Sequence, residues 1–275
     1  MGTLSKAEDT TDIKLSIQIS LNGLSFCALS PETRRILFFR DIPFSRRLNP
    51  SEVLQQIEKV YHQETFLQEA QPEVKLLYST ELYSLVPQDF FAEDQALDYL
   101  KFNTRILEND FAAHDQLESR GIINVHIPFA NINNYFFDKY GEFEYRHCVS
   151  LLIENLSHDT ESHEEPIVYL HCYTGGYDLL VFRKNQLELA NSFRCNTKED
   201  FIYYLLFTAE QLKLDPDRFE LVLLGKIREN SDFYNMAYTY IRNIRFLETS
   251  FGYIFSQEGD LPKGYMYYTL FKSLE

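Results

Sequence analysis

The sequence has no tryptophan, and glycine, proline, cysteine and methionine are all scarce. Its 275 residues include ten Gly, nine Pro, four Cys and three Met. So few glycines and prolines, beside 45% hydrophobic and 24% charged residues, exclude a collagen-like or a disordered chain. The cysteines form no C-x-x-C pair, so the sequence contains neither a zinc knuckle nor a redox motif, and we expect reduced thiols. They are Cys27, Cys148, Cys172 and Cys195.

Positive charge and long apolar runs are also in short supply. The chain has 26 Lys and Arg against 41 Asp and Glu, a formal net charge of −15, which argues against binding to nucleic acid or to an anionic membrane surface. The longest apolar run, residues 201–207, is far shorter than the roughly 20 residues of a membrane-spanning helix, so we expect no membrane insertion. Residues 1–12 are polar and resemble no secretory signal. We therefore predict a disordered N-terminal tail over 1–12 and a cytoplasmic protein.

The first half of the chain begins with three predicted strands. Residues 15–21 and 24–29 flank the turn formers Asn22-Gly23, which is typical of a β-hairpin, and a third strand is expected over 36–39. Asn49, Pro50 and Glu52 then indicate a capped helix start. The later predictions are strands over 74–78, 82–86, 121–127 and 143–147, a helix from about Ala92 that carries Leu97, Leu100, Thr104, Leu107 and Phe111, and an apolar helix over 148–156.

A polar segment then separates two stretches with the same predicted order of elements. Residues 157–165 contain no apolar side chain, so we predict a linker there, between a first half over 13–156 and a second half over 166–275. Thr197 and Asp200 indicate a capping pair at the start of a helix that the apolar run after it predicts to be buried nearly all round. The other elements predicted in the second half are strands over 167–173, 177–182, 187–193, 221–224 and 244–247 and a helix over 232–240.

The two halves also share the position of their first turn. Placing Leu15 on Ile167, a shift of 167 − 15 = 152, puts Ile17 on Tyr169 and Gly23 on Gly175. The order of three strands, a helix, a strand and a helix occurs in both halves. This repetition predicts a duplicated α/β architecture with a cleft between its halves.

Three stretches of the sequence resemble a known family. They are residues 98–111 (DYLKFNTRILENDF), 123–138 (beginning INVHIP) and 191–204 (NSFRCNTKEDFIYY). The chain resembles a Bacteroidetes family of unknown function assigned to the fold of actin, the sugar kinases and the heat-shock-chaperone ATPases. The resemblance implies an α/β fold built from two related ribonuclease-H-like halves. Relative to the ATPases themselves, the likeness lies in the order of elements.

The resemblance also identifies the residues that would form a nucleotide site. In active members the first strand of each half ends in an Asp-x-Gly hairpin. Its carboxylate orders water and Mg²⁺, and its backbone N–H groups approach phosphate. Here Ser20 and His171 stand at those carboxylate positions. The adenosine-binding motif of active members is a strand that ends in two glycines; this chain retains one of them, Gly225, and Lys226 follows it. The candidate cleft residues are Asn22, Gly23, Thr174, Gly175, Gly176 and Gly225.

Each candidate also has a purely structural interpretation. The glycines at the two turns suit any hairpin, because glycine tolerates positive φ with or without a ligand. Lys226 and Asp178 could instead restore a phosphate contact and a magnesium ligand. His171 and Cys172 are adjacent on one strand and point to opposite faces, so we expect a buried, paired histidine and no nucleophile pair.

Two charged clusters outside the cleft also have both a functional and a purely structural interpretation. His158, Asp159, Glu161, His163 and Glu164 have metal-binding side chains, but a solvated linker explains them. A second cluster could receive an anionic partner or form a charged face at a sheet edge. It consists of Arg34, Arg35, Arg40, Arg46 and Arg47.

These observations support two hypotheses and exclude a third. We predict a catalytically inactive relative of the actin-like ATPases, with a degenerate cleft, no cofactor and another protein as its partner. The alternative is an ATP- and Mg²⁺-dependent ATPase or phosphotransferase that uses both hairpin turns as phosphate loops. A nuclease is set aside, because the first strand has no acidic residue and the net charge is −15.

Overall fold

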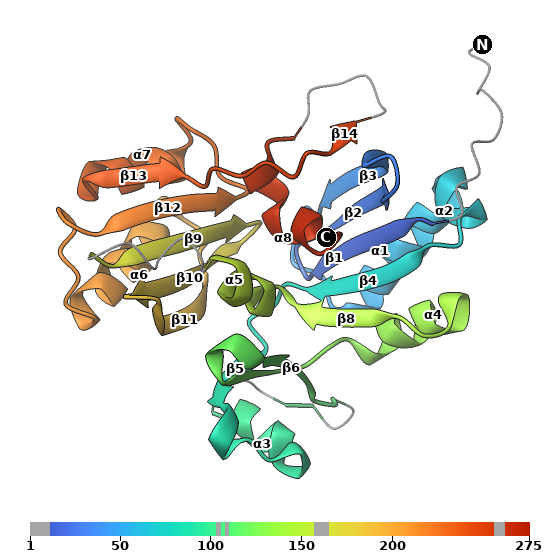
Figure 1. Cartoon of the computed structure of the whole chain (residues 1–275), viewed down its shortest axis with the longest axis horizontal. Helices are drawn as coiled ribbons and strands as arrows, with labels where there is room; N and C mark the ends of the chain where they lie inside the picture. Colours follow the sequence, from blue (N-terminus) through green and yellow to red (C-terminus); the bar gives the residue numbers. More distant parts are fainter. Residues whose placement is uncertain (1–11, 103–105, 108–109, 157–164, 256–261) are drawn as a thin grey trace.

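The protein is built around two large β-sheets, with a small third sheet beside them (Figure 1). The computed structural model describes residues 12–102, 106–107, 110–156, 165–255 and 262–275, so most of the predicted tail and linker lies outside the described residues. The strand orders are β14-β3-β2-β1-β4-β8, β11-β10-β9-β12-β13 and β5-β7-β6. Apart from the edge strand β14, the two large sheets repeat one order of five strands.

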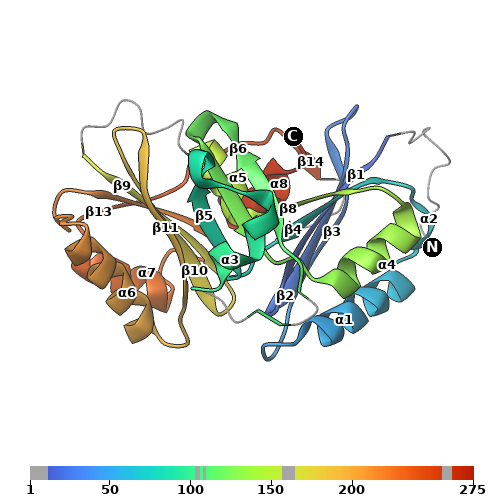
Figure 2. The same ribbon diagram turned by 90° about the horizontal axis from the view of Figure 1, so that it is seen from below.

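The first sheet carries its helices on the outer face (Figure 2). Asn49 and Glu52 form both hydrogen bonds of the predicted capping box, and Val53 and Ile57 are among the residues that α1 buries. Its strands are β1 (Lys14–Ser20), β2 (Gly23–Ser30), β3 (Arg35–Pro43), β4 (Glu73–Tyr78), β8 (Glu144–His147) and β14 (Ile254–Phe255), and its helices are α1 (Pro50–Gln63), α2 (Thr65–Glu69) and α4 (Ala130–Tyr140).

The second sheet has the same design, with α6 and α7 on its outer face (Figure 2). Thr197 and Asp200 form the predicted capping box of α6. The expectation that α6 is buried all round is wrong, because Tyr203 and Phe207 are 59% and 46% exposed. Its elements are β9 (Ile167–Tyr173), β10 (Gly176–Arg183), β11 (Gln186–Arg194), β12 (Glu220–Gly225), β13 (Asn243–Phe246), α6 (Lys198–Gln211) and α7 (Asp232–Tyr240).

A small subdomain is inserted between β4 and α4. The helix predicted from Ala92 through Phe111 is shorter in the structure: a 3₁₀ turn leads into a helix that ends at Leu100. Leu107 is 60% exposed and, like Phe111, lies outside any helix, so the apolar spacing did not mark a continuous helical face. Its elements are β5 (Tyr83–Pro87), β6 (Ala113–Leu117), β7 (Ile122–His126), α3 (Ala96–Leu100) and the 3₁₀ turns η1 (Gln88–Phe90), η2 (Glu93–Gln95) and η3 (Glu118–Arg120).

One hydrophobic core joins the two halves. Helix α5 (Cys148–Leu156) and the C-terminal η5 (Gly264–Tyr267) and α8 (Tyr268–Lys272) lie between the two large sheets (Figure 1). Buried residues of both sheets and of α5 and α8 form a single cluster. Strand β14 pairs with β3. The end of the chain therefore packs against the first sheet, although it lies within residues 166–275, the predicted second half.

The strand pairing corrects the predicted alignment of the halves by one residue. Ser20 pairs with Gly23 at the first turn, and Tyr173 pairs with Gly176 at the second, so the shift is 176 − 23 = 153. A one-residue change moves every side chain of a strand to the other face. With a shift of 153, Ile17 corresponds to Leu170. Each of these residues is buried in the outer core of its half, the cluster between the large sheet and the helices on its outer face. The predicted partner of Ile17, Tyr169, faces the shared core instead.

Candidate functional site between the hairpin turns

The two turns predicted to flank a nucleotide touch each other. A Cβ atom built on Gly175 would lie 2.9 Å from Nδ2 of Asn22, so the Asn22 side chain of the first turn packs on the backbone of the second. Gly175 has φ +89°, a conformation that favours glycine. The structure thus brings Asn22 and Gly175 into contact.

Internal contacts account for the other glycines of the turns. A Cβ on Gly23 would meet the carbonyl oxygen of Ile42 at 3.0 Å, and one on Gly176 would meet that of Phe193 at 2.4 Å. The Ser20 hydroxyl donates to the Gly23 carbonyl at 3.0 Å and accepts from the Asn22 N–H at 3.1 Å. Ser20 therefore closes its own turn. Thr174 lies in the second turn and is exposed.

Gly225 has a structural role at the end of β12. Its φ is +80°, and a Cβ there would lie 2.1 Å from the carbonyl oxygen of Cys172 on the neighbouring strand β9. The N–H of the next residue, Lys226, donates to that same carbonyl at 2.7 Å. Glycine at position 225 is therefore required for the close approach of these backbones.

Lys226 crosses from the second half to an acidic residue of the first. Its Nζ donates to Oδ1 of Asp41 on β3 at 2.5 Å, and the Ser25 hydroxyl donates to the same oxygen at 2.7 Å. The Tyr267 hydroxyl donates to Oδ2 of Asp41 at 3.1 Å. Burial and the nearby Asp41 charge raise the pKa of Tyr267. Both oxygens of Asp41 are thus occupied. No local sequence pattern indicates this pair, because its members are 185 positions apart.

Asp178, the other carboxylate considered for Mg²⁺, is buried and bonded on both oxygens. Its Oδ2 lies 3.0 Å from Nδ1 of His171, and its Oδ1 accepts from the Ser192 hydroxyl at 2.5 Å. His171 is therefore a buried, paired histidine, as predicted. Because the carboxylate stands between serine and histidine, the histidine cannot take a proton from the serine, and this is no Ser-His-Asp triad. Burial raises the pKa of the adjacent Cys172 thiol well above its usual value, which opposes thiolate formation.

A further polar cluster joins the halves beside the turns. Glu81, in the loop after β4, accepts from Arg47 at 2.8 Å and also pairs with Arg194 at the end of β11. Burial lowers the pKa of both arginines. Two guanidinium groups share one carboxylate here, so the cluster carries excess positive charge.

Internal partners explain most of the arginine cluster seen in the sequence. In addition to the pair of Arg47 with Glu81, Arg40 pairs with Glu64 at 2.8 Å and Arg46 pairs with Glu52 at 2.5 Å. Arg34 donates to the carbonyl oxygen of Phe251. The acidic and histidine cluster at 158–164 lies outside the described residues, and within the described ranges no group of three or more His, Cys, Asp or Glu is placed to hold a metal.

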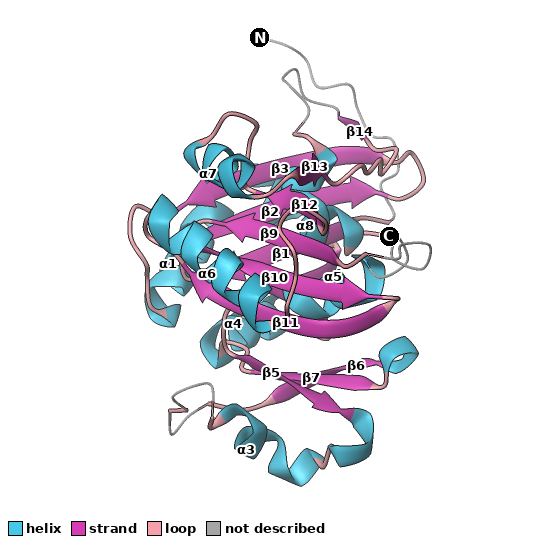
Figure 3. Ribbon diagram, turned by 90° about the vertical axis from the view of Figure 1, so that its left-hand side faces the viewer, coloured by secondary structure: helices cyan, strands magenta, loops and turns pink. Residues whose placement is uncertain are grey.

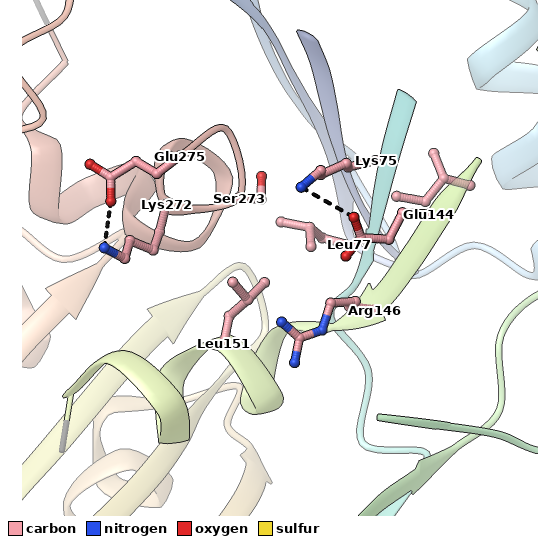
Figure 4. A pocket seen from close by; sticks show the side chains of 9 residues that line it. Lys75, Leu77, Glu144, Arg146, Leu151, Lys272, Ser273 and Glu275 are labelled. Atoms are coloured by element: carbon pink, nitrogen blue, oxygen red, sulfur yellow. Dashed lines mark hydrogen bonds and ion pairs between the residues drawn. The ribbon is translucent and has the colours of Figure 1, made fainter. Parts of the chain in front are cut away.

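A separate cavity of about 140 Å³ lies between β4, β8, α5 and the end of the chain (Figure 4). Three basic side chains line it, and each pairs with an acid. Lys75 pairs with Glu144 at 3.1 Å, Arg146 with Glu154 at 2.9 Å, and Lys272 with Glu275. Among the described residues that line the cavity, no basic side chain is therefore left free for an anionic ligand.

Comparison with known proteins agrees with this architecture. A protein from Bacteroides thetaiotaomicron, described as having an actin-like ATPase fold and unknown function, superposes with a TM-score of 0.77 at 23% identity over 89% of this chain and 94% of its own. The PilM-PilN type IV pilus biogenesis complex matches with a TM-score of 0.52 at 8% identity, over 85% and 88% of the two chains. The chain therefore has an actin-like ATPase fold.

The family follows from the sequence comparison. The model of the family described as Protein of unknown function (DUF3822) matches residues 5–244, so the chain belongs to that family. No curated protein matches. Within the described helices, none has the length and apolar character needed to cross a membrane.

Proposed function

We propose that this protein is a catalytically inactive actin-fold module that binds another protein. The contact between Asn22 and Gly175 carries the proposal, because the two turns touch here, whereas the turns of an ATPase would have to leave room for phosphate between them. The carboxylates near the turns favour the same conclusion. Asp41 and Asp178 already accept hydrogen bonds on both oxygens, and Mg²⁺ would have to displace these internal donors.

A protein partner is supported by the fold and by the acidic surface. One solved structure with this fold, PilM-PilN, is a complex between proteins. The net charge of −15 opposes nucleic acid and anionic lipid as partners. We also propose that the module works in the cytoplasm.

Thermal unfolding with and without nucleotide tests the loss of ATP binding. A ligand that binds only the native state raises its stability by about 2.7 kcal/mol at a hundredfold excess over Kd. We expect ATP or ADP with Mg²⁺ at millimolar concentration to leave the Tm unchanged relative to Mg²⁺ alone. Asn22→Ala, which removes the amide between the turns, is the matched variant and should show no response either.

The result against the proposal is a nucleotide-dependent rise in the Tm of the native chain. It would favour the ATPase alternative, and phosphate release by the same sample would then establish the reaction. A rise in Asn22→Ala alone would show that the amide is the only obstacle and that the remaining turn residues still recognise phosphate.

A further inference from the structure

Two strand edges, each unpaired within the described residues, face each other across a cavity beside the second sheet. Strand β5 is the edge of the small sheet and β11 is the edge of the second large sheet, and β5 lies beside β11 (Figure 3). The cavity between them measures about 690 Å³. Within the described residues no backbone hydrogen bond joins the two strands. We call this cavity the edge groove; Tyr83, Ser84, Leu85, Leu189, Ala190 and Ser192 line it.

Side-chain contacts bridge the edge groove at both ends. The Ser192 and Tyr83 hydroxyls lie 3.3 Å apart at one end. At the other end, Arg120 donates to the carbonyl and to the side-chain oxygen of Asn185 at 2.5 Å and 3.0 Å. Tyr83 begins β5 and Ser192 is near the end of β11, so the two strands run antiparallel. These bridges hold the two strand edges together at both ends of the groove.

The hydrogen-bond ladder shows which backbone groups of β11 face the groove. The Cys195 N–H donates to the Gly175 carbonyl, so odd-numbered positions at this end of β11 face β10. Alternation then turns the N–H and C=O groups of Ala190 and Ser192 outward. The Ser192 N–H indeed donates to the Asn191 side chain at 3.0 Å, and not to β10.

The same reasoning applies to β5. The Gln88 N–H donates to the Gly121 carbonyl, and the Ile127 N–H donates to the Leu82 carbonyl. Even-numbered positions of β5 therefore face β7, and the N–H and C=O groups of Tyr83 and Leu85 face the groove. Strand β5 thus presents two donors and two acceptors to the groove, and β11 presents two acceptors and the Ala190 N–H, because the Ser192 N–H is already bonded to the Asn191 side chain.

The floor and one end of the groove define what it would accept. Leu85 and Ala190 line the groove and pack against the shared core, so this part of the lining is apolar. At the Ser192 end, Arg47 and Arg194 share the single carboxylate of Glu81. This end carries excess positive charge in a protein with a net charge of −15.

We propose that the edge groove binds an extended peptide segment of a partner protein, which adds a strand between β11 and β5. The segment runs antiparallel to β11, the more stable pairing, and spans about five residues over about 17 Å. Its main chain supplies the hydrogen bonds, alternate apolar side chains contact Leu85 and Ala190, and an acidic residue at its N-terminal end meets Arg194.

The proposal names the partner chemistry of the binding module and rests on that part of the proposed function. The groove adjoins the second turn, because Arg194 pairs with Gly176, but the two tests probe different residues: Asn22 at the turns, and Leu85 and Ala190 in the groove. A nucleotide response and a peptide response are therefore separate results.

A peptide array on the full chain tests the proposal. The probes are hexapeptides with Asp at the first position and with alternating apolar and random residues after it, and fluorescence anisotropy gives the Kd of each peptide that binds. Ala190→Pro removes one outward N–H at an edge position where proline is tolerated, and Ala190→Ser keeps that N–H and is the control. We expect Ala190→Pro to bind about tenfold more weakly and Ala190→Ser to bind as the native chain does.

Three further measurements do not depend on the folding of the proline variant. N-methylation of the peptide amides that face β11 should abolish binding, and hydrogen exchange should show that the peptide protects the Leu85 and Ala190 amides. Arg194→Gln should remove the preference for Asp over Asn at the first position. The proposal is overturned if no peptide binds below about 1 mM, if N-methylated peptides bind equally, or if protection appears elsewhere.

Discussion

At the scale of single residues, His147 shows how burial fixes a protonation state. It lies where β8 meets α5, and its side chain is 1% exposed. The Val149 N–H donates to Nδ1 at 3.2 Å, so the proton is on Nε2, which donates to the Thr80 carbonyl at 3.0 Å. A second proton on Nδ1 would break the first bond. Burial, together with the neighbouring His126, holds the pKa of His147 well below its ordinary value.

This histidine should make the protein less stable in mild acid. Below about pH 6.5 the unfolded chain takes up a proton that the native chain does not bind, so the free energy of unfolding falls as pH falls, by up to ~1.4 kcal/mol per unit. Burial also lowers the pKa of His126, which adds to this slope. Urea unfolding between pH 8 and pH 5 measures the slope. His147→Gln should flatten it, whereas His62→Gln, at an exposed position, should not; equal slopes in both variants contradict the assignment.

At the scale of elements, α6 has a buried face and an aromatic face in water. Phe201 is fully buried and stacks on Phe233 at 4.9 Å, whereas Phe207 is 46% exposed and stacks on Tyr203. We expect Phe201→Ala to lower the free energy of unfolding by about 3 to 5 kcal/mol. Phe207→Ala should change it by no more than about 0.5 kcal/mol, because the site is exposed and alanine favours helix. Denaturant midpoints of the two variants test this, and equal losses would mean that α6 is buried on both faces.

Elements with local sequence signals, such as helix-capping residues, were predicted from the sequence. Both capping boxes are formed, and α7 begins and ends where the sequence indicated. Strand β6 was missed because its sequence, Ala-His-Asp-Gln-Leu, is polar and pairing with β7 makes it a strand. Helix α4 was missed because Phe129 at its N-cap gives no side-chain capping bond. Tertiary contact decides such segments, and single-residue preferences do not.

The site could be predicted only as a set of residue types. The sequence identified the turn glycines and the absence of an acid at Ser20, but the corrected shift places Tyr173, and not His171, at the equivalent position of the second half. The contact of Asn22 with Gly175 and the pair of Lys226 with Asp41 join residues more than 150 positions apart. Such contacts follow from how the two sheets pack, so no local pattern encodes them.

At the scale of the whole molecule, the shared core determines how the halves unfold. Residues of both sheets, of α5 and of α8 form one buried cluster, and Lys226 and Glu81 add polar links between the halves. Neither half can lose its structure without exposing apolar surface of the other. We therefore expect one cooperative transition, in contrast to two domains joined only by a linker.

The absence of tryptophan makes this expectation directly measurable. Phe143→Trp and Phe233→Trp each place a single tryptophan at a partly buried position, the first on the outer core of the first half and the second on that of the second. Both reporters should give the same urea midpoint and the same slope, because each half unfolds only with the shared core. Leu152→Ala, which opens a cavity in α5 within that core, should shift both midpoints down together. Two separate midpoints, or a shift in one reporter alone, would show that the halves are independent domains.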